Sequence, residues 1–226
     1  MRVLVVLLLA GLVALTAAEV LVPPRIEQGV EERVASQVPE ATSVDATVRS
    51  FPVVPRVLAT GGIEHLVVTL ADVARPEVRI DSVRIDVWGI DVSRRALLDG
   101  EVDFQHIDRG ALTATITEED LEETLPGNVA DLRLLPGRAE VTVAGQAAGS
   151  DVTVRDGRVV FDLGALPDAG VALPGQEFFP CLLQGEAVHG ALRLSCSLDE
   201  VPPYLLRRFE SAAHGTHPLE RPVPGG

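Results

Sequence analysis

The chain has 226 residues, which predicts one domain or at most two and is enough to bury a core without stabilising cross-links. Hydrophobic residues make up 46% of the chain but aromatic residues only 4%, so the core must be aliphatic. The formal net charge is −14 and every basic residue is Arg. This acidity argues against nucleic-acid binding and against electrostatic adhesion to anionic lipid, so any lipid contact has to be hydrophobic.

The first 22 residues are predicted to be a signal peptide or a signal anchor. One Arg is followed by an uncharged apolar run from Val3 to Ala18, and Glu19 ends this run. The run is typical of a secretory signal, with residues 16–18 as the candidate cleavage site. With the residues up to Val22 it also approaches the roughly 20 residues of a membrane span, and we favour an uncleaved or slowly cleaved form. Either form predicts a protein of the periplasm or cell envelope.

An amphipathic helix is predicted over Pro24–Val38. Two prolines mark its start, because Pro is well suited to a first helical turn. Acidic residues fill most of one face of this helix. The other face carries one apolar stripe, with a residue at every fourth position: Ile26, Val30, Val34 and Val38. Such a stripe must pack on, or lie along, another apolar surface.

After this helix the apolar period changes to 2, which predicts strands. The predicted strands are 43–51, 62–73, 77–92, 101–107, 111–117, 138–145, 150–156 and 158–164. No alternation of strands with helices appears, so the sheet is expected to be antiparallel. In 77–92 the apolar phase shifts near Asp81-Ser82 and again near Trp88-Gly89. These shifts predict two β-bulges and a strongly curved sheet.

The remaining elements are a short helix after Thr117, with acidic residues in its first turn, and a final helix after Val201. The predicted organisation is a single domain over residues 23–212, with a disordered, Pro- and Gly-rich tail over 213–226.

The two cysteines are predicted to form a structural disulfide. The segments 177–184 and 191–198 read as a hairpin, and pairing Cys181 with Cys196 places Leu183 opposite Leu194. A disulfide fits an extracytoplasmic compartment. No Gly or His pattern near either cysteine supports a catalytic thiol.

The sequence offers no catalytic or metal-binding constellation. The five histidines are interpreted as scattered surface residues: His65, His106, His189, His214 and His217. The carboxylates of 81–91 alternate with Arg on a solvated strand face, and those of 118–120 match a helix dipole. No serine hydrolase, zinc-protease, P-loop or Rossmann motif is present. The sequence therefore predicts no enzyme, no metal and no cofactor.

Several short elements follow one another in the order of a known family. Phe51-Pro52, Leu58 and a Gly pair follow the amphipathic helix, Asp72-Val73 closes the next strand, and the segment 117–121 opens the short helix. Over roughly residues 20–165 this arrangement resembles the actinobacterial LmeA-like phospholipid-binding family. The resemblance implies a β-rich α+β fold of the tubular type found in bactericidal/permeability-increasing proteins. In that fold a strongly curved antiparallel sheet wraps around a long amphipathic helix.

The resemblance also implies a function. It predicts an envelope protein that binds phospholipid or another acyl lipid and supports lipoglycan (lipomannan) maturation, without catalysis. The disulfide hairpin and the long acidic C-terminal half depart from the family pattern. The alternative is a structural or protein-interaction module of the envelope whose apolar faces pack as a dry core.

The segment 50–62, SFPVVPRVLATGG, is unusually apolar for a connection between two strands. Ser50 can cap a short helical element here, Pro52 can start it and Gly61 can end it. One interpretation is a helical turn that plugs one end of the curved sheet. The other is the rim of a lipid tube, which adds residues of this segment to the stripe on the first helix. The predicted lipid-binding residues are then Ile26, Val30, Val34, Phe51, Val53, Val54 and Leu58.

Overall fold

The protein is β-rich, with a strongly curled antiparallel sheet. The computed structural model describes residues 2–93, 95, 103–125, 129–143, 145–164, 169–175 and 178–202, with side chains from Leu15 onwards. The described elements are α1 (Arg2–Gln37), β1 (Ala41–Val48), α2 (Val53–Thr60), β2 (Gly62–Ala74), β3 (Arg79–Val92), β4 (Phe104–Thr117), α4 (Glu118–Thr124), β5 (Val129–Leu135), β6 (Arg138–Val143), β7 (Gln146–Arg155), β8 (Arg158–Asp162), β9 (Ala169–Ala172), β10 (Gln184–Val188) and β11 (Ala191–Leu198).

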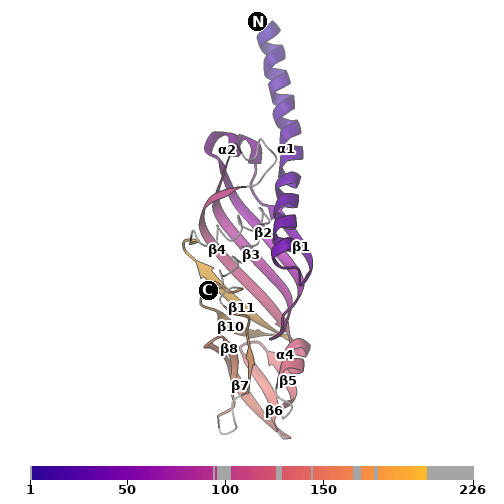
Figure 1. Ribbon diagram of the computed structural model, residues 1–226, viewed down its shortest axis with the longest axis vertical. Helices are drawn as coiled ribbons and strands as arrows, with labels where there is room; N and C mark the ends of the chain where they lie inside the picture. Colours follow the sequence, from indigo (N-terminus) through magenta and orange to yellow (C-terminus); the bar gives the residue numbers. More distant parts are fainter. Residues whose placement is uncertain are drawn as a thin grey trace, which may run out of the picture.

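The strands form two antiparallel sheets. The six-stranded sheet has the order β1-β2-β3-β4-β11-β10, and the five-stranded sheet has the order β5-β6-β7-β8-β9. They lie end to end along the long axis, with α4 beside the smaller sheet (Figure 1). One core cluster includes buried side chains from both sheets and from α1. The expected curved antiparallel architecture is confirmed, and the predicted strands 101–107 and 111–117 are one strand, β4.

The first helix differs from its prediction. It does not begin at Pro24 but runs without a break from Arg2 to Gln37, with both prolines inside it. Each proline removes one intrahelical hydrogen bond. The turns on both sides are held by other contacts, since Glu19 bonds to α2 and Ile26 is buried in the core. Tertiary contacts therefore outweigh the local helix-starting signal of the two prolines.

The two predicted bulges in β3 are wrong. The β2–β3 register is unbroken from the pair Gly62↔Asp91 to the pair Ala74↔Arg79, and the β3–β4 register shifts only between Asp91 and Val92. The phase shifts themselves are real, because the buried positions of β3 change parity between Ile80 and Val83 and again before Ile90.

Left-handed residues lie at both phase shifts. Gly89 has φ 63°, and Asp72, which faces Asp81 across the β2–β3 pair, has φ 55°. The side-chain alternation of both paired strands therefore reverses without an inserted residue. A side chain at Gly89 would also collide with Asp108 on β4, so both the backbone conformation and the lack of space require glycine there.

The Cys181–Cys196 disulfide is confirmed, with 5.8 Å between the Cα atoms. The predicted hairpin register is wrong by two residues, because Gly185 rather than Leu183 lies opposite Leu194. A two-residue turn at positions 189–190, with Gly190 at φ 70°, fixes the register instead. The predicted final helix from residue 203 onwards and the tail 213–226 lie outside the described residues.

Candidate lipid-binding surfaces

The six-stranded sheet carries a continuous apolar face, which we call the inner face. Because side chains that are paired across antiparallel strands share one side of the sheet, the register sorts them into rows. Two full rows of the inner face are Val44–Leu70–Val83–Ala114–Leu194 and Ala46–Val68–Ile85–Leu112–Cys196. The next row towards α2 contains Val48, Leu66 and Val87. Every side chain of these rows is apolar.

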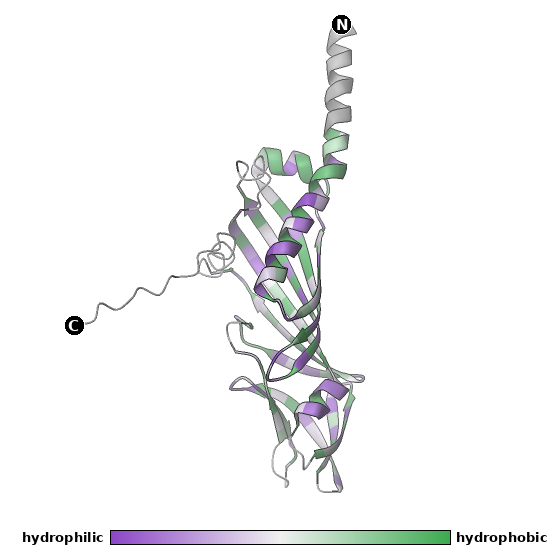
Figure 2. Cartoon of the chain, turned by 45° about the vertical axis from the view of Figure 1, so that its right-hand side comes forward, coloured by the Kyte–Doolittle hydropathy of each residue, from purple (hydrophilic) through white to green (hydrophobic). Residues whose placement is uncertain are grey.

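The opposite face of the same strands, which we call the outer face, is largely polar. One of its rows reads Asp45–Thr69–Arg84–Thr113–Ser195. Figure 2 shows this contrast as alternating hydrophilic and hydrophobic residues along the strands. The inner face is therefore an apolar surface that the sheet presents to one side only.

Helix α1 lies along the edge strand β1 and turns its apolar stripe into the core. The carboxylates of Glu27 and Glu31 accept hydrogen bonds from the backbone N–H groups of Val48 and Ala46, at 2.8 and 2.9 Å. These bonds occupy donors on the free edge of β1 that would otherwise be open to another strand. Two acidic side chains of the helix therefore hydrogen-bond to the edge of the sheet, while its apolar stripe packs into the core.

The predicted stripe residues lie in the same core cluster as the inner face. Ile26 is 2% exposed and Val30 is 4% exposed, whereas Val34 is only partly buried. On the central strand β3, Ile85 and Val87 are also only partly buried. The inner face therefore retains accessible apolar surface in the middle of the sheet.

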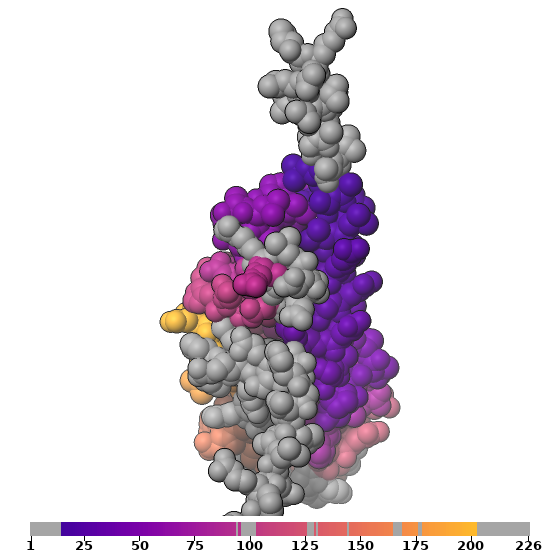
Figure 3. Space-filling view, turned by 45° about the horizontal axis from the view of Figure 1, so that its top comes forward, coloured from indigo at the N-terminus to yellow at the C-terminus, as the bar shows by residue number. Residues whose placement is uncertain are grey.

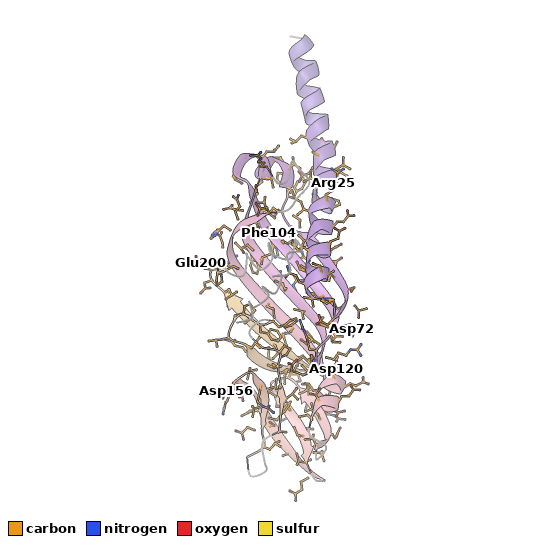
Figure 4. All side chains as sticks on the ribbon, viewed as in Figure 1. Arg25, Asp72, Phe104, Asp120, Asp156 and Glu200 are labelled. Atoms are coloured by element: carbon orange, nitrogen blue, oxygen red, sulfur yellow. A yellow bond between two sulfur atoms is a disulfide. The ribbon has the colours of Figure 1, made fainter. Side chains whose placement is uncertain are left out.

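A second apolar surface lies where α1 passes α2. Among the described residues, six large hydrophobic side chains are exposed, and five of them belong to α1 or to the segment 51–58. We call four of these five residues the apolar tip: Val20 (71% exposed), Leu21 (58%), Phe51 (83%) and Leu58 (61%). Helices α1 and α2 contact each other and appear side by side in Figures 1 and 3. Figure 4 places Arg25 on α1 near the level of α2.

The segment 50–62 divides its predicted lipid-binding residues between two environments. Val53 and Val54 lie on the buried face of α2, whereas Phe51 and Leu58 face outward. As expected, Gly61 ends the helix in the left-handed conformation, with its N–H bonded to the carbonyl of Val57 at 2.8 Å. The burial of Val53 and Val54 is what the plug interpretation requires, and the exposure of Phe51 and Leu58 leaves them outside such a plug. Contact of any of the four with lipid stays a prediction.

Glu19 is a structural residue that sequence reasoning missed. Its carboxylate accepts hydrogen bonds from the backbone N–H groups of Val53 and Val54, the latter at 2.8 Å. It thereby does the work expected of Ser50, whose Oγ instead accepts from the N–H groups of Glu64 and His65. The sequence signal for this role was one acidic residue, Glu19, inside a long apolar run.

The outer face carries an aromatic and charged cluster at the α2 end of the sheet. His65 stacks on Trp88 with ring centroids 4.9 Å apart, and the Arg109 guanidinium lies 4.8 Å from the centroid of the same Trp ring. Asp86 accepts from Arg84 at 2.7 Å and contacts His65 Nε2 at 2.9 Å. Burial acts to raise the pKa of Asp86, but the hydrogen bonds from Arg84 and His65 outweigh it and hold that pKa below its ordinary value.

Four further findings bear on function. The residues whose side chains are described include no group of three or more His, Cys, Asp or Glu arranged to hold a metal ion. No helix within that part of the chain is long and apolar enough to cross a membrane. No curated protein and no solved structure matches the chain. A family model does match, over residues 17–225, and the chain therefore belongs to the LmeA-like phospholipid-binding family.

Proposed function

We propose that this protein is a non-enzymatic phospholipid-binding protein of the cell envelope, which holds or transfers lipid with the acyl chains against the inner face. The observation that carries the proposal is the run of fully apolar rows across the six-stranded sheet, left only partly covered at Ile85 and Val87. An acyl chain needs no other lining, because its binding comes from apolar area removed from water.

In this proposal the curved sheet wraps around the C-terminal half of α1, and lipid lies between them. Val34, which is partly buried, contacts the acyl chain directly, while Ile26 and Val30 line the space from the fully buried part of the stripe. Val53 and Val54, on the buried face of α2, close the end of this space. The exposed side chains of Phe51 and Leu58 contact lipid outside this space.

The proposed location is extracytoplasmic. The Cys181–Cys196 disulfide and the apolar N-terminal run support it. We propose that residues 1–22 act as a signal peptide or anchor, that residues 23–212 form one lipid-binding domain, and that the protein supports lipomannan maturation. That last role rests on the family resemblance alone.

A dry structural or protein-interaction module is the second candidate. The observation in its favour is the tight burial of much of the inner face, since Val83 and Leu194 are almost completely inaccessible. In a dry core these side chains would contact only protein.

A pair of tryptophan substitutions separates the two candidates. Ile85→Trp fills the partly open part of the inner face, whereas Ser82→Trp adds the same bulk to the outer face of the same strand. We expect saturable displacement of a fluorescent fatty acid by phospholipid in the parent chain and in Ser82→Trp, and at least tenfold weaker binding in Ile85→Trp. Absence of saturable binding in the folded parent, or equal binding by both variants, would overturn the proposal.

A further inference from the structure

The apolar tip is held in place by bonds that leave its side chains facing solvent. Three valines of α2 are buried, and the Glu19 carboxylate accepts hydrogen bonds from the first two N–H groups of that helix. At its other end, the Gly61 carbonyl accepts from the N–H of Val92 at 2.8 Å, and Arg56 pairs with Glu64 at 2.8 Å. The outward direction of Phe51 and Leu58 is therefore fixed by the fold.

The packing of the described residues does not account for the exposure of the tip. Exposed apolar side chains add no burial energy, and scattered ones need no explanation. Here, however, four of them lie on α1 or on the segment 51–58, which contact each other, whereas Leu182 is the one exposed large hydrophobic side chain among the described residues that lies outside these two segments. An apolar cluster of this kind marks a surface that binds something apolar.

The path of α1 indicates what that partner is. Beyond the tip, α1 continues towards Arg2, past α2 (Figure 1), and residues 3–18 of this part contain no charged side chain. A lipid bilayer is the partner whose chemistry matches both this segment and the tip beside it. The net charge of −14 makes attraction to anionic headgroups a poor alternative, so the contact is hydrophobic.

We propose that the apolar tip, Val20, Leu21, Phe51 and Leu58, is a docking surface that inserts into the interfacial region of a phospholipid bilayer. This contact is distinct from the acyl-chain site on the inner face. Docking also brings that site to the membrane, because α2 joins the end of β1 to the start of β2, next to the row of Val48, Leu66 and Val87. Lipid that enters the inner face would pass this row first.

Fluorescence quenching in the full chain tests the insertion directly. Trp88 is the only tryptophan, so Trp88→Phe gives a dark background in which Phe51→Trp and Leu182→Trp each report on one exposed site. The probes are phosphatidylcholine vesicles with bromine on the acyl chains. We expect at least threefold stronger quenching at position 51 than at 182, unchanged in 0.5 M NaCl. Equal quenching at both positions, no quenching at 51, or loss of quenching in salt would overturn the proposal.

A second measurement needs no substitution of Trp88. The unmodified chain is irradiated on vesicles that contain a photoactivatable acyl chain, and trypsin then releases residues 50–56 as one peptide. We expect lipid adducts on Phe51 in this peptide and none on Leu182 itself. The Val20→Ser/Leu21→Ser double variant should dock more weakly yet bind the fluorescent fatty acid as tightly as the parent chain, which separates failure of this inference from failure of the proposed lipid site.

Discussion

The bond between Glu19 and α2 gives the sharpest test of how this fold is assembled. Glu19→Ala removes a carboxylate that accepts from two backbone N–H groups at the start of α2, where the N-cap residue, Pro52, makes no side-chain cap bond. Loss of a helix cap typically costs about 1 kcal/mol, and hydrogen bonds to charged groups contribute about 1.5–3 kcal/mol. Because the site is partly buried, we expect a local loss of about 2 kcal/mol.

Hydrogen exchange of the Val53 and Val54 amides measures this loss. A change of about 2 kcal/mol corresponds to roughly 30-fold faster exchange, because 1.4 kcal/mol is a factor of ten. The control is Glu32→Ala, which removes an exposed carboxylate from the same helix. Glu19→Gln should lie between the two, since an amide oxygen still accepts a hydrogen bond. If exchange in Glu19→Ala matches that in Glu32→Ala, the capping role is refuted.

Three further predictions concern stability, each read from urea unfolding. Gly89→Ala should lower the free energy of unfolding by more than about 2 kcal/mol, because the backbone is left-handed there and an added Cβ would collide with Asp108 on β4. Gly145 is also left-handed but has open space around it, so Gly145→Ala should lower it by only about 1 kcal/mol. Asp86 has a lowered pKa, so its stabilising effect is present above the unfolded pKa of about 3.9 and is lost as pH falls through the folded pKa. Asp86→Asn should therefore reduce the difference in unfolding free energy between pH 7 and pH 3. An unchanged difference would contradict this. Reduction of the Cys181–Cys196 disulfide, with a sequence separation of 15, should cost about 3 kcal/mol, and an unchanged unfolding midpoint would argue against this effect.

Local patterns predicted the elements whose structure is decided locally. The alternation of apolar residues gave the strands of the inner face, and Thr117 accepts the hydrogen bond from the Asp120 N–H that a helix start requires. The antiparallel arrangement and the disulfide also followed from sequence patterns, whereas the curvature was predicted from two bulges that β3 does not have. Strand alternation and the helix cap are decided by contacts within a few residues.

The predictions that failed depend on contacts between distant parts of the chain. Glu19 meets its partners on α2 across more than thirty positions, and no local pattern indicates that pairing. The two prolines suggested a helix start because the contacts on both sides of them were not visible in the sequence. The sequence showed the phase shifts of β3, but one of them coincides with the left-handed backbone of Asp72, which lies on the neighbouring strand β2.

Native mass spectrometry of the purified full chain, released from mild detergent, is the most direct test of the central claim. The account predicts a peak for the chain with one or more bound phospholipids, absent from Ile85→Trp and retained by Ser82→Trp. Both variants should unfold at urea concentrations close to that of the parent chain. A parent chain that carries the disulfide and the native fold, yet shows only the lipid-free mass even after incubation with phospholipid, would contradict the account.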